Sequence, residues 1–341
     1  MILNKSIYVD KKTDVSLKEF MGLIDIEQES KDLSCFLCKT RNFELISDKD
    51  RYGLFYPTGV CLDCGHVQQT SYLNAESLNI FYESHYRDIY KTGSPEELFL
   101  SQYFKAAKKI DNFIGSTSKK NILEVGCGPG GILKHFQDKY NSQVLGIDLD
   151  QRYLDFGKEN GVNLINSTIE DYESKQKYDL IVVCHVLEHL NNPIDFLMKL
   201  RSLLDENGSI YIEVPSLESV KNGAYGKNLQ NFFHIAHISH FTEKSIQRLI
   251  YLSDYEITKF NNTIQVLIQD SSKKDKNLLT NEPNSYKYTK NLLKEISNSE
   301  NKFGFLFLNI FVLFFYRKTR LRDLVNLAKI RIFKSKYNSK N

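Results

Sequence analysis

Apolar and polar stretches alternate regularly over the middle of the chain, and this pattern predicts strands and helices in turn. The predicted strands span residues 121–125, 143–147, 162–165, 178–184, 208–214, 255–260 and 262–269. The predicted helices span residues 131–140, 150–160, 193–204 and 242–251. Strands that alternate with helices at this spacing indicate an α/β fold with a doubly wound parallel sheet. We therefore expect a seven-stranded, Rossmann-like sheet.

The other segments divide the 341-residue chain into four predicted parts. Residues 1–70 contain two cysteine pairs and form a predicted N-terminal module. Residues 71–118 are rich in aromatic side chains and predict a helical lid or linker. The α/β core covers residues 119–270, and residues 271–341 predict a helical extension with a basic end.

Net charge becomes informative when it is divided along the chain. The whole chain carries +3, but residues 317–341 hold nine Lys/Arg and one acid, so the other 316 residues carry −5. A mildly acidic body argues against nucleic acid as a partner. The basic character belongs to the C-terminal segment alone.

The basic end follows a Phe-rich apolar run, residues 303–316. This run is shorter than the roughly 20 residues that a bilayer-spanning helix needs. An apolar segment before a cationic one is typical of a peripheral membrane anchor. The alternative is a C-terminal helix packed on the body or on a second subunit of a homodimer. Because the N-terminus has no secretory signal, we expect a cytoplasmic protein, with peripheral membrane contact left open.

Two CxxC pairs, Cys35 with Cys38 and Cys61 with Cys64, are separated by 22 residues. In a reducing compartment this spacing indicates metal ligands. Four thiolates at about 2.3 Å make a closed tetrahedral zinc site. A closed site leaves no position for chemistry, so we expect structural zinc; the alternative is a pair of redox dithiols.

A glycine loop lies between the first predicted strand and helix of the core, with Gly126, Gly128 and Gly130 at alternate positions. Asp148 ends the next strand, 22 residues after Gly126, where a carboxylate can hold two ribose hydroxyls. A dinucleotide site favours the spacing GxGxxG, whereas this loop is GxGxG. The acidic Glu124 just before the loop repels phosphate and suits a cationic ligand.

On these residues, segment 121–215 resembles the class I S-adenosylmethionine (SAM)-dependent methyltransferases. The resemblance implies that Gly126 and Gly128 approach the methionine part of SAM and that Asp148 binds its ribose. The sequence from Cys184 to Leu190 matches the family segment after the fourth strand. The residues expected to bind SAM are Glu124, Gly126, Cys127, Gly128, Gly130, Asp148, Leu149, Thr168, Ile169, Cys184 and His185.

Cysteine knuckles before such a core, with a His-rich segment after it, resemble the sugar methyltransferases of deoxysugar and surface-polysaccharide pathways, including capsule and O-antigen synthesis. A C-methylating branch of that group carries the pattern YHEHxSYF, which residues 234–241 match in part, and His237 aligns with its active-site histidine. Ala236 replaces its glutamate and His234 its tyrosine. The departures favour O-methylation of a hydroxyl on a nucleotide-activated sugar. C-methylation of a keto-sugar, a lipid-linked or polymeric glycan acceptor, and an inactive zinc- and SAM-binding module remain open.

The histidine segment is the predicted catalytic region. His237 is the expected general base, because histidine titrates near neutral pH. His234 or His240 would orient it, and Glu188 lies at the same sheet edge. The alternative is a second divalent metal, held by these histidines with Glu188, Glu213 or His185, that polarises the acceptor hydroxyl.

A Tyr-rich stretch before the core is the predicted substrate surface. Tyr82, Tyr86 and Tyr90 recur every four residues, so a helix places them on one face. Tyrosine suits sugar stacking and hydrogen bonding, and Arg87 suits a diphosphate. His189 completes the expected substrate-binding set; the alternative is a packing stripe on the core.

Overall fold

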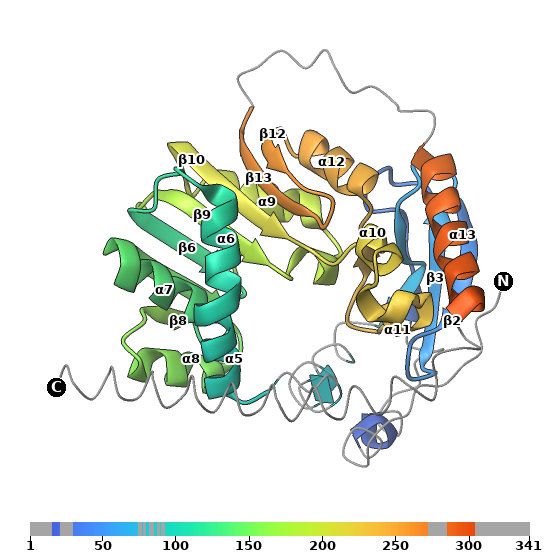
Figure 1. Ribbon diagram of the computed structural model, residues 1–341, viewed down its shortest axis with the longest axis horizontal. Coiled ribbons are helices and arrows are strands. Elements are labelled where there is room, and N and C mark those ends of the chain that lie inside the picture. The colour runs from blue at the N-terminus through green and yellow to red at the C-terminus, as the bar shows by residue number, and fades with distance from the viewer. Residues whose placement is uncertain are drawn as a thin grey trace.

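The structure is a computed structural model. It describes residues 16–20, 30–73, 77, 80–81, 85–86, 89, 93–271 and 285–303. Two sheets lie side by side in it: a large α/β sheet built from the middle of the chain, and a smaller sheet with the blue N-terminal strands (Figure 1).

The large sheet confirms the predicted α/β architecture. Its strands are β6 (Asn121–Val125), β7 (Gln143–Asp148), β8 (Leu164–Asn166), β9 (Tyr178–Cys184), β10 (Leu204–Glu213), β12 (Tyr255–Phe260) and β13 (Gln265–Asp270). The order is β12-β13-β10-β9-β6-β7-β8. β13 runs antiparallel to both of its neighbours, and the other pairs are parallel. All seven predicted strands are present, three with the predicted ends and four with shifted ends.

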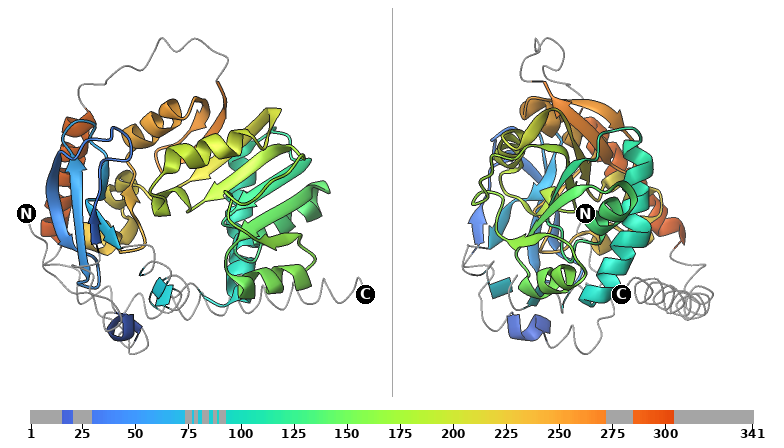
Figure 2. Two further views of the ribbon diagram at one scale, coloured as in Figure 1. Left: turned by 180° about the vertical axis from the view of Figure 1, so that it is seen from behind. Right: turned by 90° about the vertical axis from the view of Figure 1, so that its left-hand side faces the viewer.

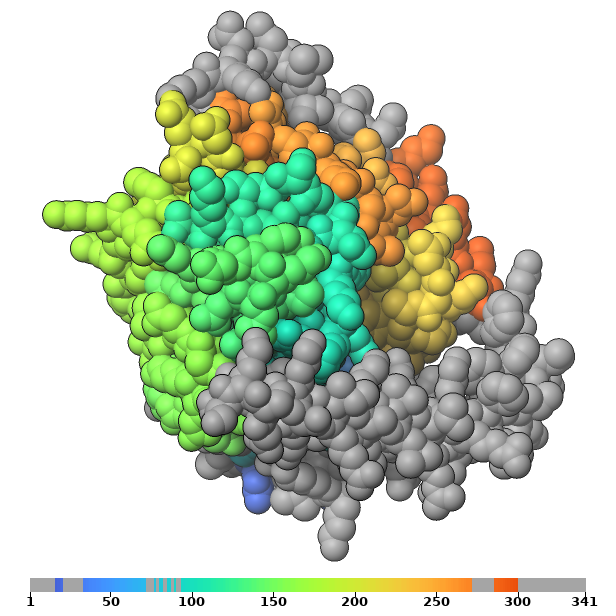
Figure 3. Space-filling model, turned by 60° about the vertical axis from the view of Figure 1, so that its left-hand side comes forward, coloured from blue at the N-terminus to red at the C-terminus, as the bar shows by residue number. Residues whose placement is uncertain are grey.

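Helices cover both faces of this sheet. They are α5 (Pro95–Ser101), the π-helix η2 (Gln102–Ala106), α6 (Ala107–Ile114), α7 (Gly131–Tyr140), α8 (Gln151–Glu159), α9 (Pro193–Arg201) and α12 (Glu243–Leu252). A buried apolar core lies on each face of the sheet, and successive strand residues point to opposite faces. Ile122 packs with α5–α8 on one face, and Leu123 packs with α9 and α12 on the other. A space-filling view shows α6 in teal against the orange surface of β12 and β13, where Lys259 Nζ donates to Phe113 O (2.6 Å) (Figure 3).

The smaller sheet combines segments from distant parts of the chain. Its antiparallel strands are β2 (Phe43–Lys49), β3 (Phe55–Cys61), β4 (Val67–Gln69) and β11 (Ser239–His240), in the order β11-β4-β3-β2. β11 pairs with β4, so a segment from the far end of the core completes the N-terminal sheet. A separate two-stranded ladder joins β1 (Ser30–Asp32) to β5 (Ser71–Leu73).

Helices from the second half of the chain cover the smaller sheet, as the view from behind also shows (Figure 2). They are α10 (Leu217–Lys221), η4 (Ala224–Lys227), α11 (Leu229–Phe232) and α13 (Ser285–Phe303). Leu293 and Ile296 of α13 share a buried core with Tyr56 and Val60 of β3. Thr289 Oγ1 donates to Gly65 O (2.8 Å), so α13 lies directly over the cysteine knuckle.

Within the described part of the chain, no helix combines the length and apolar character needed to cross a membrane. The Phe-rich run after Phe303 and the basic end, residues 317–341, lie outside the described residues. Their membrane contact and the homodimer stay predictions, as does the four-part division of the chain.

Candidate functional site

The glycine loop is fixed by backbone contacts at the carboxyl edge of the large sheet. The N–H groups of Gly126 and Cys127 both donate to Ile147 O, at 2.8 and 3.1 Å. Gly126 has φ 72°, and a Cβ added there would lie 2.6 Å from Val186 Cγ2. Gly128 and Gly130 also have positive φ. The chain therefore needs glycine in this loop both for conformation and for space.

Asp148 is held at the same edge by two backbone donors. Its Oδ2 accepts from the N–H of Gly128 at 2.8 Å, and its Oδ1 accepts from the N–H of Asp150 at 2.9 Å. These contacts fix the carboxylate beside the loop. A carboxylate oriented in this way suits the paired hydroxyls of a ribose.

Glu124 is the unusual group of the loop. Its side chain is 1% exposed, and among the described residues no hydrogen-bond partner reaches its Oε2. Burial, and then the negative charge of Asp148, raise the pKa of Glu124 well above its usual range. A buried acid without a cation favours its neutral form, so this position suits a positively charged ligand.

The other expected SAM-binding residues border the same crevice in different ways. Leu149 is exposed, and its carbonyl accepts from Asn166 Nδ2 (3.0 Å). Thr168 Oγ1 donates to Asp171 Oδ2 (2.7 Å), and Ile169 is buried. Cys184 ends β9 half-buried, and His185 follows it. Because β6 lies between β7 and β9, the crevice is at a topological switch point, where ligands bind in such sheets.

Glu188 is the centre of the histidine cluster. It lies in the single turn η3 (Leu187–His189) after β9 and is 1% exposed. Its Oε1 lies 3.3 Å from His185 Nδ1, 3.9 Å from His237 Nε2 and 4.0 Å from His189 Nε2. The structure thus brings three histidines to one carboxylate. His185 was expected to bind SAM, His189 to bind the substrate and His237 to act in catalysis.

The other two histidines of the segment are placed differently. The ring of His234 lies 3.5 Å from that of His237, centroid to centroid. His240 instead pairs through Nε2 with the hydroxyl of Tyr56 at 2.7 Å. His240 is therefore held by the small sheet.

The electrostatics of His237 bear on its expected role as a base. Burial, followed by the charges of His234, His189, His240 and Arg51, holds the pKa of His237 well below its usual range. The imidazole is therefore neutral at neutral pH. One ring nitrogen then carries a hydrogen and the other a free lone pair, and the ring takes up a second proton only weakly.

Glu213, a candidate in the metal alternative, is engaged elsewhere. Its Oε1 accepts from Lys109 Nζ (2.6 Å) and its Oε2 from Tyr211 Oη (2.6 Å). Burial would raise the pKa of Glu213, but the hydrogen bonds from Lys109 and Tyr211 outweigh it and lower that pKa. Lys109 is a residue of this edge that sequence patterns missed, because it is one of many lysines on a helix.

Of the expected substrate surface, Tyr86 can be placed. Its ring meets the ring of His189 edge-on, with centroids 6.4 Å apart. Tyr82, Arg87 and Tyr90 lie outside the described residues. Tyr86 therefore connects the aromatic stretch to the histidine cluster, and the other three positions stay predictions.

The cysteine pairs come together beneath α13. Cys35 Sγ lies 3.5 Å from Cys64 Sγ, and Cys38 Sγ lies 3.4 Å from Cys61 Sγ. All four sulfurs lie within 4.8 Å of one another, and none is in a disulfide. A tetrahedral ion with bonds of about 2.3 Å needs sulfurs about 3.8 Å apart. The residues present therefore fit zinc.

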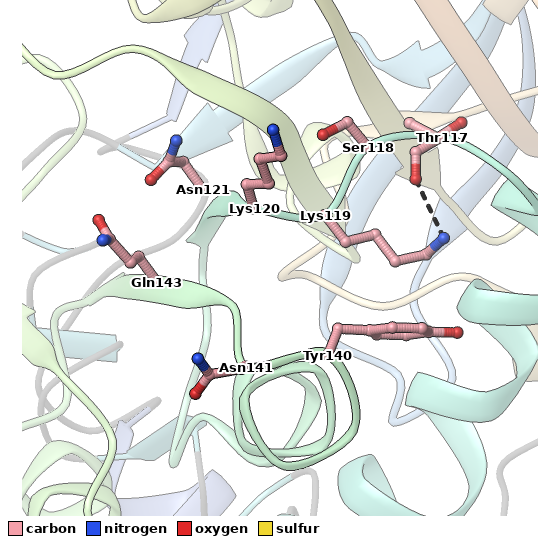
Figure 4. Close-up of a pocket in the computed structure, with 8 residues that line it drawn as sticks. All are labelled: Thr117, Ser118, Lys119, Lys120, Asn121, Tyr140, Asn141 and Gln143. Atoms are coloured by element: carbon pink, nitrogen blue, oxygen red, sulfur yellow. Dashed lines mark hydrogen bonds between the residues drawn. The ribbon is translucent and has the colours of Figure 1, made fainter.

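A separate hollow lies at the opposite, amino edge of the sheet (Figure 4). Its lining residues are Thr117, Ser118, Lys119, Lys120, Asn121, Tyr140, Asn141 and Gln143. Lys119 Nζ donates to Thr117 O there (3.0 Å). This hollow is remote from the glycine loop and contains none of the expected site residues.

We expect Cys61→Ser to remove one tightly bound zinc per chain and to lower the Tm, because three thiolates bind the ion more weakly and the folding energy that zinc supplies is lost. Metal analysis of the dialysed protein and thermal unfolding measure both effects. Cys184→Ser is the matched control, since this thiol lies outside the cluster. An unchanged zinc content in Cys61→Ser would contradict the assignment.

Comparisons with known proteins agree on the large sheet. Residues 99–259 match a family model described as a methyltransferase domain. The ubiquinone biosynthesis O-methyltransferase of Rickettsia felis is 34% identical over 111 residues, which are 31% of this chain and 45% of that protein. Malonyl-[acyl-carrier protein] O-methyltransferase 1 of Ilyobacter polytropus is 30% identical over 180 residues, 47% of this chain and 66% of that protein.

Among solved structures, the plantazolicin methyltransferase BpumL in complex with SAH is 21% identical, with a TM-score of 0.38, over 66% of this chain and 86% of that one. The chain spans 45% to 66% of the length of the two curated relatives. The matched segment contains the glycine loop, Asp148 and Glu188. Residues 99–259 therefore resemble known methyltransferase domains in sequence.

Proposed function

We propose that this chain transfers a methyl group from SAM to a hydroxyl oxygen, and that the acceptor is a nucleotide-activated sugar used for surface polysaccharide. The single observation that carries the proposal is the cluster of Glu188 with His189 and His237, at the same sheet edge as the glycine loop. A methyl donor and a group that activates a hydroxyl need this proximity.

SAM supplies a methyl carbon on a positively charged sulfur. In the transfer, the acceptor oxygen forms a bond to this carbon, the carbon–sulfur bond breaks, and the hydroxyl proton leaves. In this proposal Asp148 holds the ribose, and the glycine loop allows close approach of the donor. Glu124 lies beneath the loop, where a carboxylate complements the positive charge of the donor.

Three observations support an oxygen acceptor and a sugar. The two curated relatives are named as O-methyltransferases, although the acceptors in their names are not sugars. The four-cysteine module and, in part, the histidine segment resemble those of the sugar enzymes. Tyr86 beside His189 adds an aromatic ring of the kind that packs on a sugar face.

Activity is tested by incubating the full chain with SAM and a panel of nucleotide-activated hexoses, deoxyhexoses and heptoses. Mass spectrometry should find one added methyl group on an acceptor, together with S-adenosylhomocysteine. Binding of SAM without transfer to the panel or to lipid-linked glycans would overturn the proposal in favour of an inactive module. Loss of deuterium from the carbon beside a carbonyl would instead identify C-methylation, which needs an enolate.

We expect Asp148→Asn to weaken SAM binding by about 10- to 100-fold, because a hydrogen bond to a charged group contributes about 1.5–3 kcal/mol. Isothermal titration measures the Kd. Asp155→Asn, on the exposed face of α8, is the control and should bind SAM as the unmodified chain does. Equal affinities in the two variants would remove Asp148 from the ribose site.

SAM binding should also release a proton from Glu124. Burial raises the pKa of this acid in the free protein, and a cationic ligand lowers it again. Affinity for SAM should therefore rise as the pH rises through the interval between the two pKa values. Titration in buffers of different ionisation enthalpy counts the protons released. Glu124→Gln should abolish this release, and a pH-independent affinity in the unmodified chain would contradict the role.

A further inference from the structure

We propose that Glu188, His189 and His237 bind a divalent transition-metal ion at the carboxyl edge of the sheet, separate from the four-cysteine site. The use of this ion in activating the acceptor hydroxyl rests on the proposed function. The binding site itself rests on the geometry of these three side chains.

The three ligand atoms converge. Glu188 Oε1 lies 3.9 Å from His237 Nε2 and 4.0 Å from His189 Nε2, and all three atoms lie within 4.8 Å of one another. A point between atoms so spaced is about 2.3–2.5 Å from each, a few tenths of an ångström longer than zinc–nitrogen bonds of about 2.0–2.1 Å. Small side-chain rotations close that difference.

Glu188 provides an independent indication of a ligand. Its side chain is 1% exposed, and its Oε2 has no hydrogen-bond partner among the residues that the structure describes. A buried carboxylate is costly unless it is paired or coordinates a metal. His185 Nδ1 lies 3.3 Å from Oε1, and the His185 side chain is 58% exposed, whereas His189 and His237 approach the same oxygen from less exposed positions.

His189 is oriented as a metal ligand. Its Nδ1 lies 2.8 Å from Ala236 O, and since a carbonyl accepts, Nδ1 carries the proton. Nε2 then presents its lone pair toward Glu188 and His237. Metal-bound histidines have this arrangement, in which the second ring nitrogen donates to a carbonyl and fixes the tautomer.

Two of the other candidate ligands are engaged by protein groups. His240 Nε2 pairs with the Tyr56 hydroxyl, and Glu213 pairs with Lys109. The donor set is therefore two imidazoles and one carboxylate. Three protein ligands leave a coordination position open, as in zinc sites that act on a bound oxygen.

The open coordination position would allow the ion to bind the acceptor hydroxyl. His189 is 20% exposed, and the ring of Tyr86 lies at its edge. An acceptor hydroxyl bound there loses its proton to water more readily, because the cation stabilises the alkoxide. The alkoxide oxygen then bonds to the methyl carbon as the carbon–sulfur bond breaks, and S-adenosylhomocysteine leaves. This step needs no strong base from His237.

Cobalt titration of the full, zinc-loaded chain tests the site. We expect one further equivalent of Co²⁺ to bind, with weak visible absorption and without the intense thiolate charge-transfer band that cobalt gives at cysteines. Glu188→Gln and His237→Ala should each weaken Co²⁺ binding at least about tenfold. His135→Ala, on α7 and outside the cluster, is the matched control and should bind as the unmodified chain does.

Circular dichroism and SAM titration establish that each variant is folded. Absence of cobalt binding beyond the cysteines, or equal binding in Glu188→Gln, His237→Ala and the control, would overturn the inference. Methyl transfer unaffected by a chelator that removes the added cobalt would also overturn the use of the ion, while the proposed function stands. If cobalt binds as expected but no acceptor is methylated, the metal site is supported and the proposed function is wrong.

Discussion

The pairing of β4 with β11 is the contact on which the candidate site depends. In this ladder Gln68 faces Ser239 and Val67 faces His240. Just before β11, Ile238 N–H donates to Glu188 O (2.8 Å). This hydrogen bond connects the histidine segment to the turn after β9. The histidine segment is thus held on one side by the small sheet and on the other by the large one. Without this pairing His237 would have no fixed position over Glu188.

The four-cysteine cluster is linked to the candidate site through the same pair of strands. The second knuckle joins the end of β3 at Cys61 to β4, and Gly65 N–H donates to Cys61 O (2.9 Å). A metal ion held by the four cysteines would fix the β3–β4 hairpin, and β4 pairs with β11 (Figure 1). A closed site that performs no chemistry would therefore position, through two strands, the proposed catalytic residues. Metal ligation would add to the apolar core that the small sheet shares with α13.

The large sheet could be predicted from the sequence because its signals are local. Each buried parallel strand is a short apolar run such as residues 178–184, bounded by polar turns, and helices separate the strands. The small sheet gave no such signal. β11 has only two residues, and its partner β4 lies about 170 residues earlier, so no pattern along the chain relates them. The position of α13 over the cysteine knuckle is equally non-local.

The two halves of the candidate site differ in the same way. The donor half lies between Glu124 and Asp148, within one strand–helix–strand unit, and the sequence alone indicates it. The acceptor half combines Tyr86, the turn after β9 and the histidine segment. The regular spacing of three histidines in this half suggested one cluster. In the structure His240 instead pairs with Tyr56, and His189 joins the cluster, its ring oriented by a hydrogen bond to Ala236 O. Acceptor recognition therefore depends on contacts between distant segments, and so a sequence of this kind identifies its methyl donor more readily than the molecule it methylates.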